Sequence, residues 1–159
     1  MNNTFNCGIG QLRHCTTLKR LRHTVTDVPN NERHMAIKVV MMPRDTNPHG
    51  TIFGGVILSY IDQAGAVGAY HEIRKAGCGR KPIVTVIMKS VEFHRPVFIG
   101  DVLSFWTTLV QLGRTSITMH VEVEAERDGQ VEKLTEAEVT YVAIESTGDK
   151  RRPVRIRDE

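Results

Sequence analysis

Hydrophobic residues change their spacing along this chain, and the change separates strand-like from helix-like segments. A short run at His34–Met42, stopped by Pro43, predicts a first strand. Gly54–Lys75 is apolar on nearly all sides and predicts one long helix, which the following glycines end. Beyond Pro82, apolar and polar residues alternate, as in strands with one buried face. This second part predicts four strands, at Ile83–His94, Val102–Leu112, Ser116–Arg127 and Lys133–Glu145.

The order of these segments, one strand, a long helix and four consecutive strands, restricts the fold class. A parallel α/β architecture needs helices and strands to alternate, and that alternation is missing. The economical arrangement is a single antiparallel sheet curled around one central helix, which is an α+β fold. One helix cannot cover both faces and both edges of such a sheet, so we expect two chains to pair as a homodimer.

Polar and basic residues dominate both ends of the sequence, although the formal net charge is only +3. Residues 1–32 are weakly periodic and are predicted to form an extension, with a short helix around Thr16–His23. Residues 33–147 are predicted to form the single domain. The remaining segment, 148–159, is predicted to be a basic tail, which suits either a solvated end or a site for an anionic ligand.

The cysteines Cys7, Cys15 and Cys78 are odd in number and far apart. Neither a disulfide framework nor a zinc site is therefore indicated, and the seven histidines show no metal-ligand spacing. The sequence contains no recognisable secretory signal and no apolar run long enough to cross a membrane. We expect a cytoplasmic protein with neither a membrane nor a nucleic-acid partner.

One carboxylate stands alone in the apolar helix. Asp62 is the sole charged residue of the stretch Gly54–Ala69. An unpaired charge in a buried helix costs several kcal/mol, so chains seldom keep one without a use or a partner. From this stretch alone, two interpretations stay open: a group that takes part in chemistry, and a buried carboxylate held by local hydrogen bonds.

The predicted helix begins with the pair Gly54–Gly55. Free backbone N–H groups at a helix start can stabilise a carbonyl oxygen that gains negative charge, although a glycine pair can also simply make the turn into the helix. Eight residues separate Gly54 from Asp62, which is about 12 Å along a helix. If both act on one substrate, Asp62 of one subunit must lie beside the helix start of its neighbour.

Two polar segments add weaker candidates. Asn47, in the loop Arg44–Thr51, has an amide that can position a water molecule or a carboxylate, although an Asx turn is its commoner use. The turn Gly113–Ser116 offers a guanidinium, two hydroxyls and backbone N–H groups, and with Arg95 it can hold phosphates. An ordinary hairpin turn has the same composition.

Three segments together, Met42–Ala66, Val91–Asp101 and Leu112–Ile117, resemble the hotdog-fold acyl-CoA thioesterases, in particular their short bacterial type with broad specificity. The motif is DTN-x-x-G-x-I-F-G-G followed by a helical Asp, and the resemblance covers about residues 36–144. It implies the hotdog fold, one long central helix wrapped by a curved antiparallel sheet. It also implies pairing into a double-hotdog dimer, and commonly a trimer of dimers.

The resemblance further implies roles for individual residues. Asp62 matches the general base or nucleophile of the family, and Asn47 matches a loop asparagine that faces this carboxylate across the subunit boundary. Gly54 and Gly55 match the helix start whose amide polarises the thioester carbonyl. The residues that lie where the family binds the nucleotide part of coenzyme A are Arg95, Gly113, Arg114, Thr115 and Ser116.

The activity that the resemblance implies is hydrolysis of acyl-CoA to a free acid and coenzyme A, with no metal or organic cofactor. A non-enzymatic hotdog protein that senses acyl-CoA is the competing interpretation, and it would not need Asp62. A dehydratase on the same fold would want a histidine in the helix region, but His49 and His71 lie away from the family's chemistry. The acyl-chain preference stays open.

Overall fold

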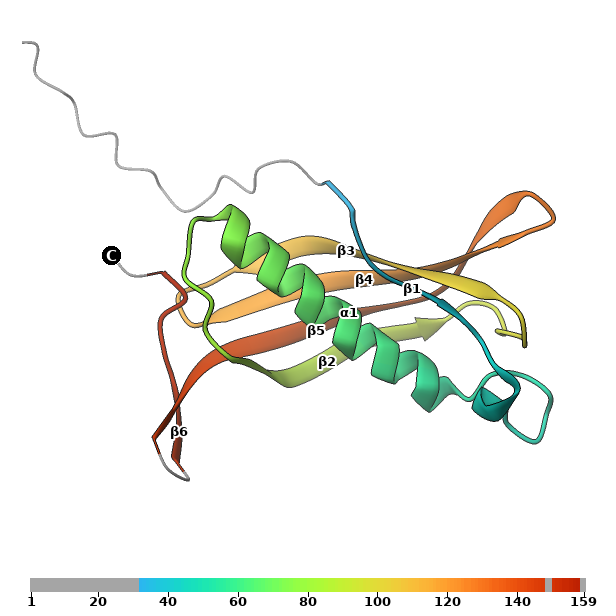
Figure 1. Cartoon of the computed structure of the whole chain (residues 1–159), viewed down its shortest axis with the longest axis horizontal. Coiled ribbons are helices and arrows are strands. Elements are labelled where there is room, and N and C mark those ends of the chain that lie inside the picture. The colour runs from blue at the N-terminus through green and yellow to red at the C-terminus, as the bar shows by residue number, and fades with distance from the viewer. Residues whose placement is uncertain (1–31, 148–149, 158–159) are drawn as a thin grey trace, which may run out of the picture.

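A computed structural model describes residues 32–147 and 150–157, and Figure 1 shows a sheet wrapped around one long helix. The predicted α+β architecture, with a long helix and an antiparallel sheet, is confirmed. In chain order, the elements are β1 (His34–Val40), the short 3-10 helix η1 (Pro43–Asp45), α1 (Gly54–Lys75), β2 (Ile83–Phe93), β3 (Val102–Leu112), β4 (Ser116–Arg127), β5 (Gln130–Thr147) and β6 (Lys150–Pro153).

The strands of the main sheet lie in the order β1-β3-β4-β5-β2, with every neighbouring pair antiparallel. The strands just before and just after α1 in sequence are therefore the two edges of this sheet. The short strand β6 pairs with the end of β5. Because β2 is an edge strand, the groups that α1 directs towards it lie at the open side of the protomer.

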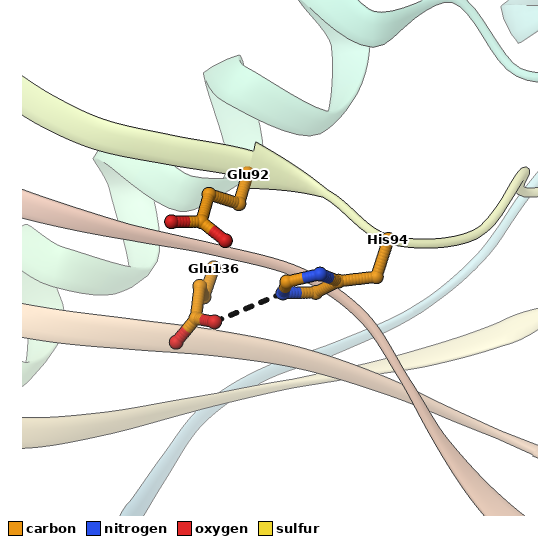
Figure 2. A group of neighbouring side chains, drawn as sticks. All are labelled: Glu92, His94 and Glu136. Atoms are coloured by element: carbon orange, nitrogen blue, oxygen red, sulfur yellow. Dashed lines mark hydrogen bonds and ion pairs between the residues drawn. The ribbon is translucent and has the colours of Figure 1, made fainter.

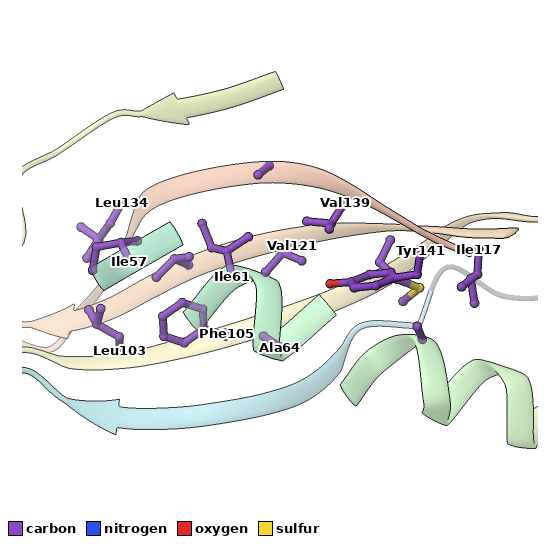
Figure 3. Close-up of a cluster of buried hydrophobic side chains, with 14 of the residues drawn as sticks. Ile57, Ile61, Ala64, Leu103, Phe105, Ile117, Val121, Leu134, Val139 and Tyr141 are labelled. Carbon is purple, nitrogen blue, oxygen red and sulfur yellow. The ribbon is translucent and has the colours of Figure 1, made fainter. Parts of the chain in front are cut away.

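Alternating side chains build the core between the sheet and the helix. In β4 the buried positions are every second residue from Ile117 to Ala125, as its sequence pattern predicted. The apolar side chains of β3 and β5 continue this surface, and α1 packs against it (Figure 3). The central members of this core are Ile57, Ile61, Ala64, Leu103, Phe105, Val121, Val139 and Tyr141.

Helix α1 buries one face only, which corrects the prediction of a helix buried nearly all round. Its inward positions are closed by the sheet, whereas Gly55, Ser59, Gln63 and Val67 are exposed. The apolar pattern did not reveal this difference, because small and apolar residues occupy both faces. Among the described residues, no helix is long and apolar enough to cross a membrane.

The basic segment after residue 147 does not behave as the solvated tail that its composition suggested. Its described part forms β6 and then returns to the domain, where Ile156 is only 1% exposed. The Val154 N–H donates to the Ala143 carbonyl, and the Ile156 N–H donates to the Arg114 carbonyl. Apolar Val154 and Ile156 alternate with arginines, so one side of this segment packs on the sheet while the other stays in solvent.

The predicted N-terminal extension, residues 1–32 with a helix around Thr16–His23, lies outside the described residues apart from Glu32. The bounds of α1, β3 and β4 agree with the prediction. Strand β5 is longer at both ends than the predicted Lys133–Glu145, because its ladder with β4 starts at Gln130 and its ladder with β6 reaches Thr147.

Candidate active site

Asp62 is held from two sides by the sheet. Its carboxylate oxygen Oδ1 accepts a 2.6 Å hydrogen bond from the Thr85 hydroxyl on β2. Its main-chain carbonyl accepts a 2.7 Å bond from the Tyr141 hydroxyl on β5. Local hydrogen bonds to Asp62, which the sequence left as one of two interpretations, are therefore present, and they fix both the backbone and the side chain of this residue.

The environment of Asp62 differs from the fully buried one that the apolar stretch suggested. The residue is half-buried, because it lies where α1 meets the edge strand β2 rather than under the middle of the sheet. Thr85, its hydrogen-bond partner, is exposed. One side of the carboxylate can therefore be reached from the open edge of the protomer.

The start of α1 presents two unpaired N–H groups. No acceptor in the described part of the chain takes the N–H of Gly54 or Gly55, whereas the next amide, that of Val56, donates to the Phe53 carbonyl. Free donors at a helix start carry the partial positive charge of the helix dipole. Their chemistry suits an oxygen that becomes negative during a reaction.

A hollow of about 320 Å³ adjoins this helix start. Gly54 and Arg95, two residues singled out from the sequence, both line it, together with the ring of Phe93. A Cβ atom at position 54 would lie 3.4 Å from this ring, an ordinary contact, so the ring stands close beside the helix start. The Arg95 guanidinium bonds to Glu132 at 2.7 Å, so part of its charge is already compensated.

Asn47 forms the Asx turn that the sequence analysis gave as its commoner use. Its Oδ1 accepts from the N–H groups of His49, at 2.9 Å, and Thr51, at 3.3 Å. Its Nδ2 donates to the Thr51 hydroxyl at 2.8 Å. An amide nitrogen has two hydrogens, so one donor remains after the turn is made. No hydrogen bond joins Asn47 to Asp62 within the described protomer.

The turn Gly113–Ser116 lies far from the other candidates. It joins β3 to β4 at the end of the sheet opposite the start of α1 (Figure 1). An eleven-residue strand such as β3 spans about 35 Å, so this turn and Arg95 cannot contact one small ligand within a protomer. The backbone of the turn is engaged, since Thr115 and Arg114 carbonyls accept from Ala143 and Ile156, while the Arg114 side chain is exposed.

Sequence reasoning missed Thr85 and Tyr141 as partners of Asp62. Both stand in predicted strands, but the two residues face each other only in the actual register of β2 and β5, where Thr85 pairs with Tyr141. The register shifts directly afterwards, between Thr85 and Ile87, so a uniform register counted from the other end of this ladder would give another pairing. The sequence contained one signal that could have found Thr85: it is a hydroxyl residue near the start of the strand that follows the helix.

A second polar group lies on the outer side of the sheet, where Figure 2 shows Glu92, His94 and Glu136. His94 Nε2 lies 2.9 Å from a Glu136 oxygen, and Lys133 Nζ lies 2.7 Å from the other. The Lys133 bond lowers the pKa of Glu136, burial opposes this effect, and His94 adds to it. Lys133 also bonds to Glu122 at 3.0 Å, so its ammonium group compensates the carboxylates of Glu122 and Glu136. His94, Glu136, Lys133 and Glu122 therefore form an ion-pair network.

Several known proteins resemble this chain in sequence and in fold. The family model described as the Thioesterase superfamily matches residues 49–132. The acyl-CoA thioester hydrolase YciA of Escherichia coli (strain K12) is 37% identical over 133 residues, covering 80% of this chain and 95% of that protein. The hexameric hotdog-fold thioesterase Cj0915 of Campylobacter jejuni is 44% identical, with a TM-score of 0.63, and the match covers 76% of this chain and 89% of that one. The hexameric thioesterase y2039 from Yersinia pestis is 34% identical, with a TM-score of 0.68, and the match covers 83% and 100% of the two chains.

Proposed function

This chain belongs to the thioesterase superfamily, and on that premise we propose that it hydrolyses acyl-CoA thioesters to a free carboxylic acid and coenzyme A. The observation that carries the proposal is the carboxylate of Asp62, held by Thr85 at the open edge of the sheet. Relatives at this level of identity are named acyl-CoA thioester hydrolases. A sensor that only binds acyl-CoA would not need a positioned acid.

Asp62 acts on the thioester in one of two ways. As a general base it takes a proton from water while the water oxygen attacks the carbonyl carbon, and the C–S bond then breaks to release coenzyme A. As a nucleophile it attacks the carbon itself, coenzyme A leaves, and water hydrolyses the resulting anhydride. The Thr85 bond orients the carboxylate in both cases.

The negative charge that develops on the carbonyl oxygen is stabilised by the free N–H groups of Gly54 and Gly55. These amides lie about 12 Å along the helix from Asp62, so one thioester cannot reach both groups of a single α1. The site is therefore shared, with Asp62 from one subunit and the helix start from the other. Asn47 enters the same site from the loop before the helix, through its remaining amide hydrogen.

Pairing of protomers through β2 fits this shared site. Strand β2 is an unpaired edge that exposes Val86 and Ile87, which are 50% and 52% accessible in the protomer. Such an edge needs a partner or a cover. We propose that two chains join here as a double-hotdog homodimer, and that the dimers assemble into a trimer of dimers, as supported by the hexameric relatives.

Binding of the coenzyme A nucleotide follows from the same symmetry. Arg95 and the turn Gly113–Ser116 lie at opposite ends of one protomer. A two-fold axis between protomers turns one protomer end for end relative to the other. Arg95 of one chain and the Arg114 region of another can then contact one ligand. The reaction needs no metal or organic cofactor in this proposal. A reducing compartment, the cytoplasm, fits a sequence whose three cysteines are odd in number and far apart.

The experiment is a thiol-release assay on acetyl-, medium- and long-chain acyl-CoA, with the wild type and Asp62→Asn. Asn keeps the size of the side chain and can still accept the Thr85 bond, but it can neither take the proton nor attack. We expect a loss of about 10²–10⁴-fold in kcat, the usual contribution of a positioned base, with the oligomer unchanged on size-exclusion chromatography. Binding of acyl-CoA without turnover by the wild type would instead identify a sensor.

A further inference from the structure

The Tyr141 hydroxyl makes an unusual contact with the helix. It donates to the main-chain carbonyl of Asp62 at 2.7 Å, from a side chain that is 1% exposed. Figure 3 shows its ring lying in the core with the hydroxyl oxygen pointing towards α1. A carbonyl oxygen has two acceptor positions, so it can take this bond beside its helical one. The contact joins β5 to α1 at Asp62, the residue whose carboxylate is the proposed reacting group.

Gly65 makes this contact possible. A Cβ atom at position 65 would overlap the Tyr141 hydroxyl oxygen, at a distance that real Cβ atoms do not show. Glycine inside a helix lowers stability relative to alanine, so a glycine here needs a packing reason. Gly65 follows Asp62 by less than one turn, and its missing side chain opens the path along which the hydroxyl reaches the carbonyl.

Thr85 and Tyr141 hold the same helical residue from adjacent positions. They are direct partners in the antiparallel ladder of β2 and β5. The Cβ atoms of cross-strand partners lie about 5 Å apart, so the two side chains leave the sheet from neighbouring points. Thr85 holds the carboxylate and Tyr141 holds the backbone of Asp62.

We infer that Tyr141 is a positioning residue for hydrolysis: it sets the place of the Asp62 backbone relative to β2, so that Thr85 holds the carboxylate in the reactive orientation. The inference rests on the proposed function, because it takes Asp62 as the reacting group. Burial raises the pKa of Tyr141 far above its usual value, and the Asp62 charge raises it further. The hydroxyl therefore stays protonated and remains a donor.

Thr107 offers a matched control within the same interface. Its hydroxyl donates to the His34 carbonyl at 3.1 Å, and its side chain, 1% exposed, fills the space left by Gly68 of α1. Thr107 thus resembles Tyr141 as a buried sheet hydroxyl against a helical glycine, but it makes no bond to Asp62. A merely structural role of Tyr141 would make the two residues equivalent.

The experiment compares Tyr141→Phe with Thr107→Val in the full-length assembled protein. Each change removes one hydroxyl and keeps nearly the same shape, so we expect both to lower Tm by similar amounts. Small displacements of a reacting group reduce rates strongly, so only Tyr141→Phe should lower kcat, by about tenfold, with KM within twofold of the wild type. Gly65→Ala, which displaces the hydroxyl while keeping Tyr141, should also lower kcat.

Wild-type kcat in Tyr141→Phe overturns the inference, and so does an equal fall of kcat in Tyr141→Phe and Thr107→Val. If Tyr141→Phe does not fold, Gly65→Ala decides in its place by the same comparison. The assay of Asp62→Asn distinguishes a failure of the proposed mechanism from a failure of the role inferred for Tyr141. An active Asp62→Asn refutes the proposed mechanism, whereas an inactive Asp62→Asn together with a fully active Tyr141→Phe refutes only the role of Tyr141.

Discussion

The hydroxyl of Thr85 donates to the carboxylate of Asp62 at 2.6 Å and links the edge strand β2 to helix α1 across 23 positions of sequence. A hydrogen bond to an ionised acceptor is about twice as strong as a neutral one and has a defined direction. The bond therefore selects one orientation of the carboxylate at the open side of the protomer.

Replacing Thr85 by Val keeps the shape of the side chain and removes this donor. The carboxylate then rotates more freely, so we expect kcat to fall by about 10- to 100-fold with little change in KM. Thr85→Ser, which keeps a hydroxyl, should retain most of the activity. Steady-state kinetics by thiol release measures both variants, and wild-type turnover in Thr85→Val would contradict the orienting role.

Gly54→Pro tests the oxyanion site through a backbone atom. Proline is well tolerated at the first position of a helix, where its missing N–H leaves no helical bond unmade. The preceding Phe53 already has the extended backbone that a residue before proline adopts, with φ −64° and ψ 127°. Loss of the Gly54 donor should lower kcat by about 10²–10³-fold.

The control for this change is Gly54→Ala, which adds a side chain but keeps the N–H. Its Cβ would lie 3.4 Å from the Phe93 ring, an ordinary contact, so kcat should stay near the wild-type value. Full activity in Gly54→Pro would remove the Gly54 amide from the oxyanion site. A similar loss in both variants would assign the effect to crowding beside Phe93.

The pattern of apolar residues was sufficient to predict β3 and β4, because apolar and polar residues alternate along them, and to predict α1, because its apolar run is long and is followed by glycines. The same pattern did not predict that Asp62 is only half-buried. A run of small and apolar residues looks the same whether a helix is covered by its own sheet or left open on one face, and only the position of β2 shows that Asp62 lies at an edge.

The contacts between strands could not be predicted from the sequence, for a different reason. The convergence of Thr85 and Tyr141 depends on a register that shifts just after Thr85, and no local pattern encodes the shift. The C-terminal segment was misjudged because its arginines dominate its composition, although the alternation of Val154 and Ile156 with arginines was visible. Charge alone does not exclude packing of a segment against the sheet.

The pair Asp101 and Arg127 predicts how stability depends on pH. Burial raises the pKa of Asp101, but bonds from the Arg127 side chain and the Phe98 N–H outweigh it, so the net pKa is lowered. A lowered pKa of an acid means that its contribution is present above the unfolded pKa of about 4 and is lost as pH falls through the folded value.

Asp101→Asn should therefore reduce the free energy of unfolding at pH 7, by about 1.5–3 kcal/mol for a hydrogen bond to a charged group. It should also make this free energy fall less steeply as the pH drops below the unfolded pKa of about 4. Asp128→Asn, in the exposed turn between β4 and β5, is the control and should change neither quantity. Denaturant titrations at several pH values measure both, and identical slopes for Asp101→Asn and wild type would contradict the prediction.

Subunit mixing tests whether Asp62 and Asn47 of different chains meet in one site. Asn47→Asp keeps the oxygen that accepts the His49 and Thr51 N–H groups, so the turn survives, but it removes the amide donors. Asp62→Asn and Asn47→Asp should each be nearly inactive alone. In a heterodimer of the two, one site collects both changes and the other collects neither, provided that the residues come from opposite subunits.

Random exchange of equal amounts makes half of the dimers heterodimers, so activity should recover to about a quarter of the wild-type value. Differently tagged chains, denatured together, refolded and purified on both tags, should reach about half, because one of two sites is intact. If Asp62 and Asn47 of the same chain formed the site, every site would carry one change and the purified heterodimer would stay inactive. Inactive heterodimers of the correct mass would thus contradict the shared site while leaving the role of Asp62 to its own assay.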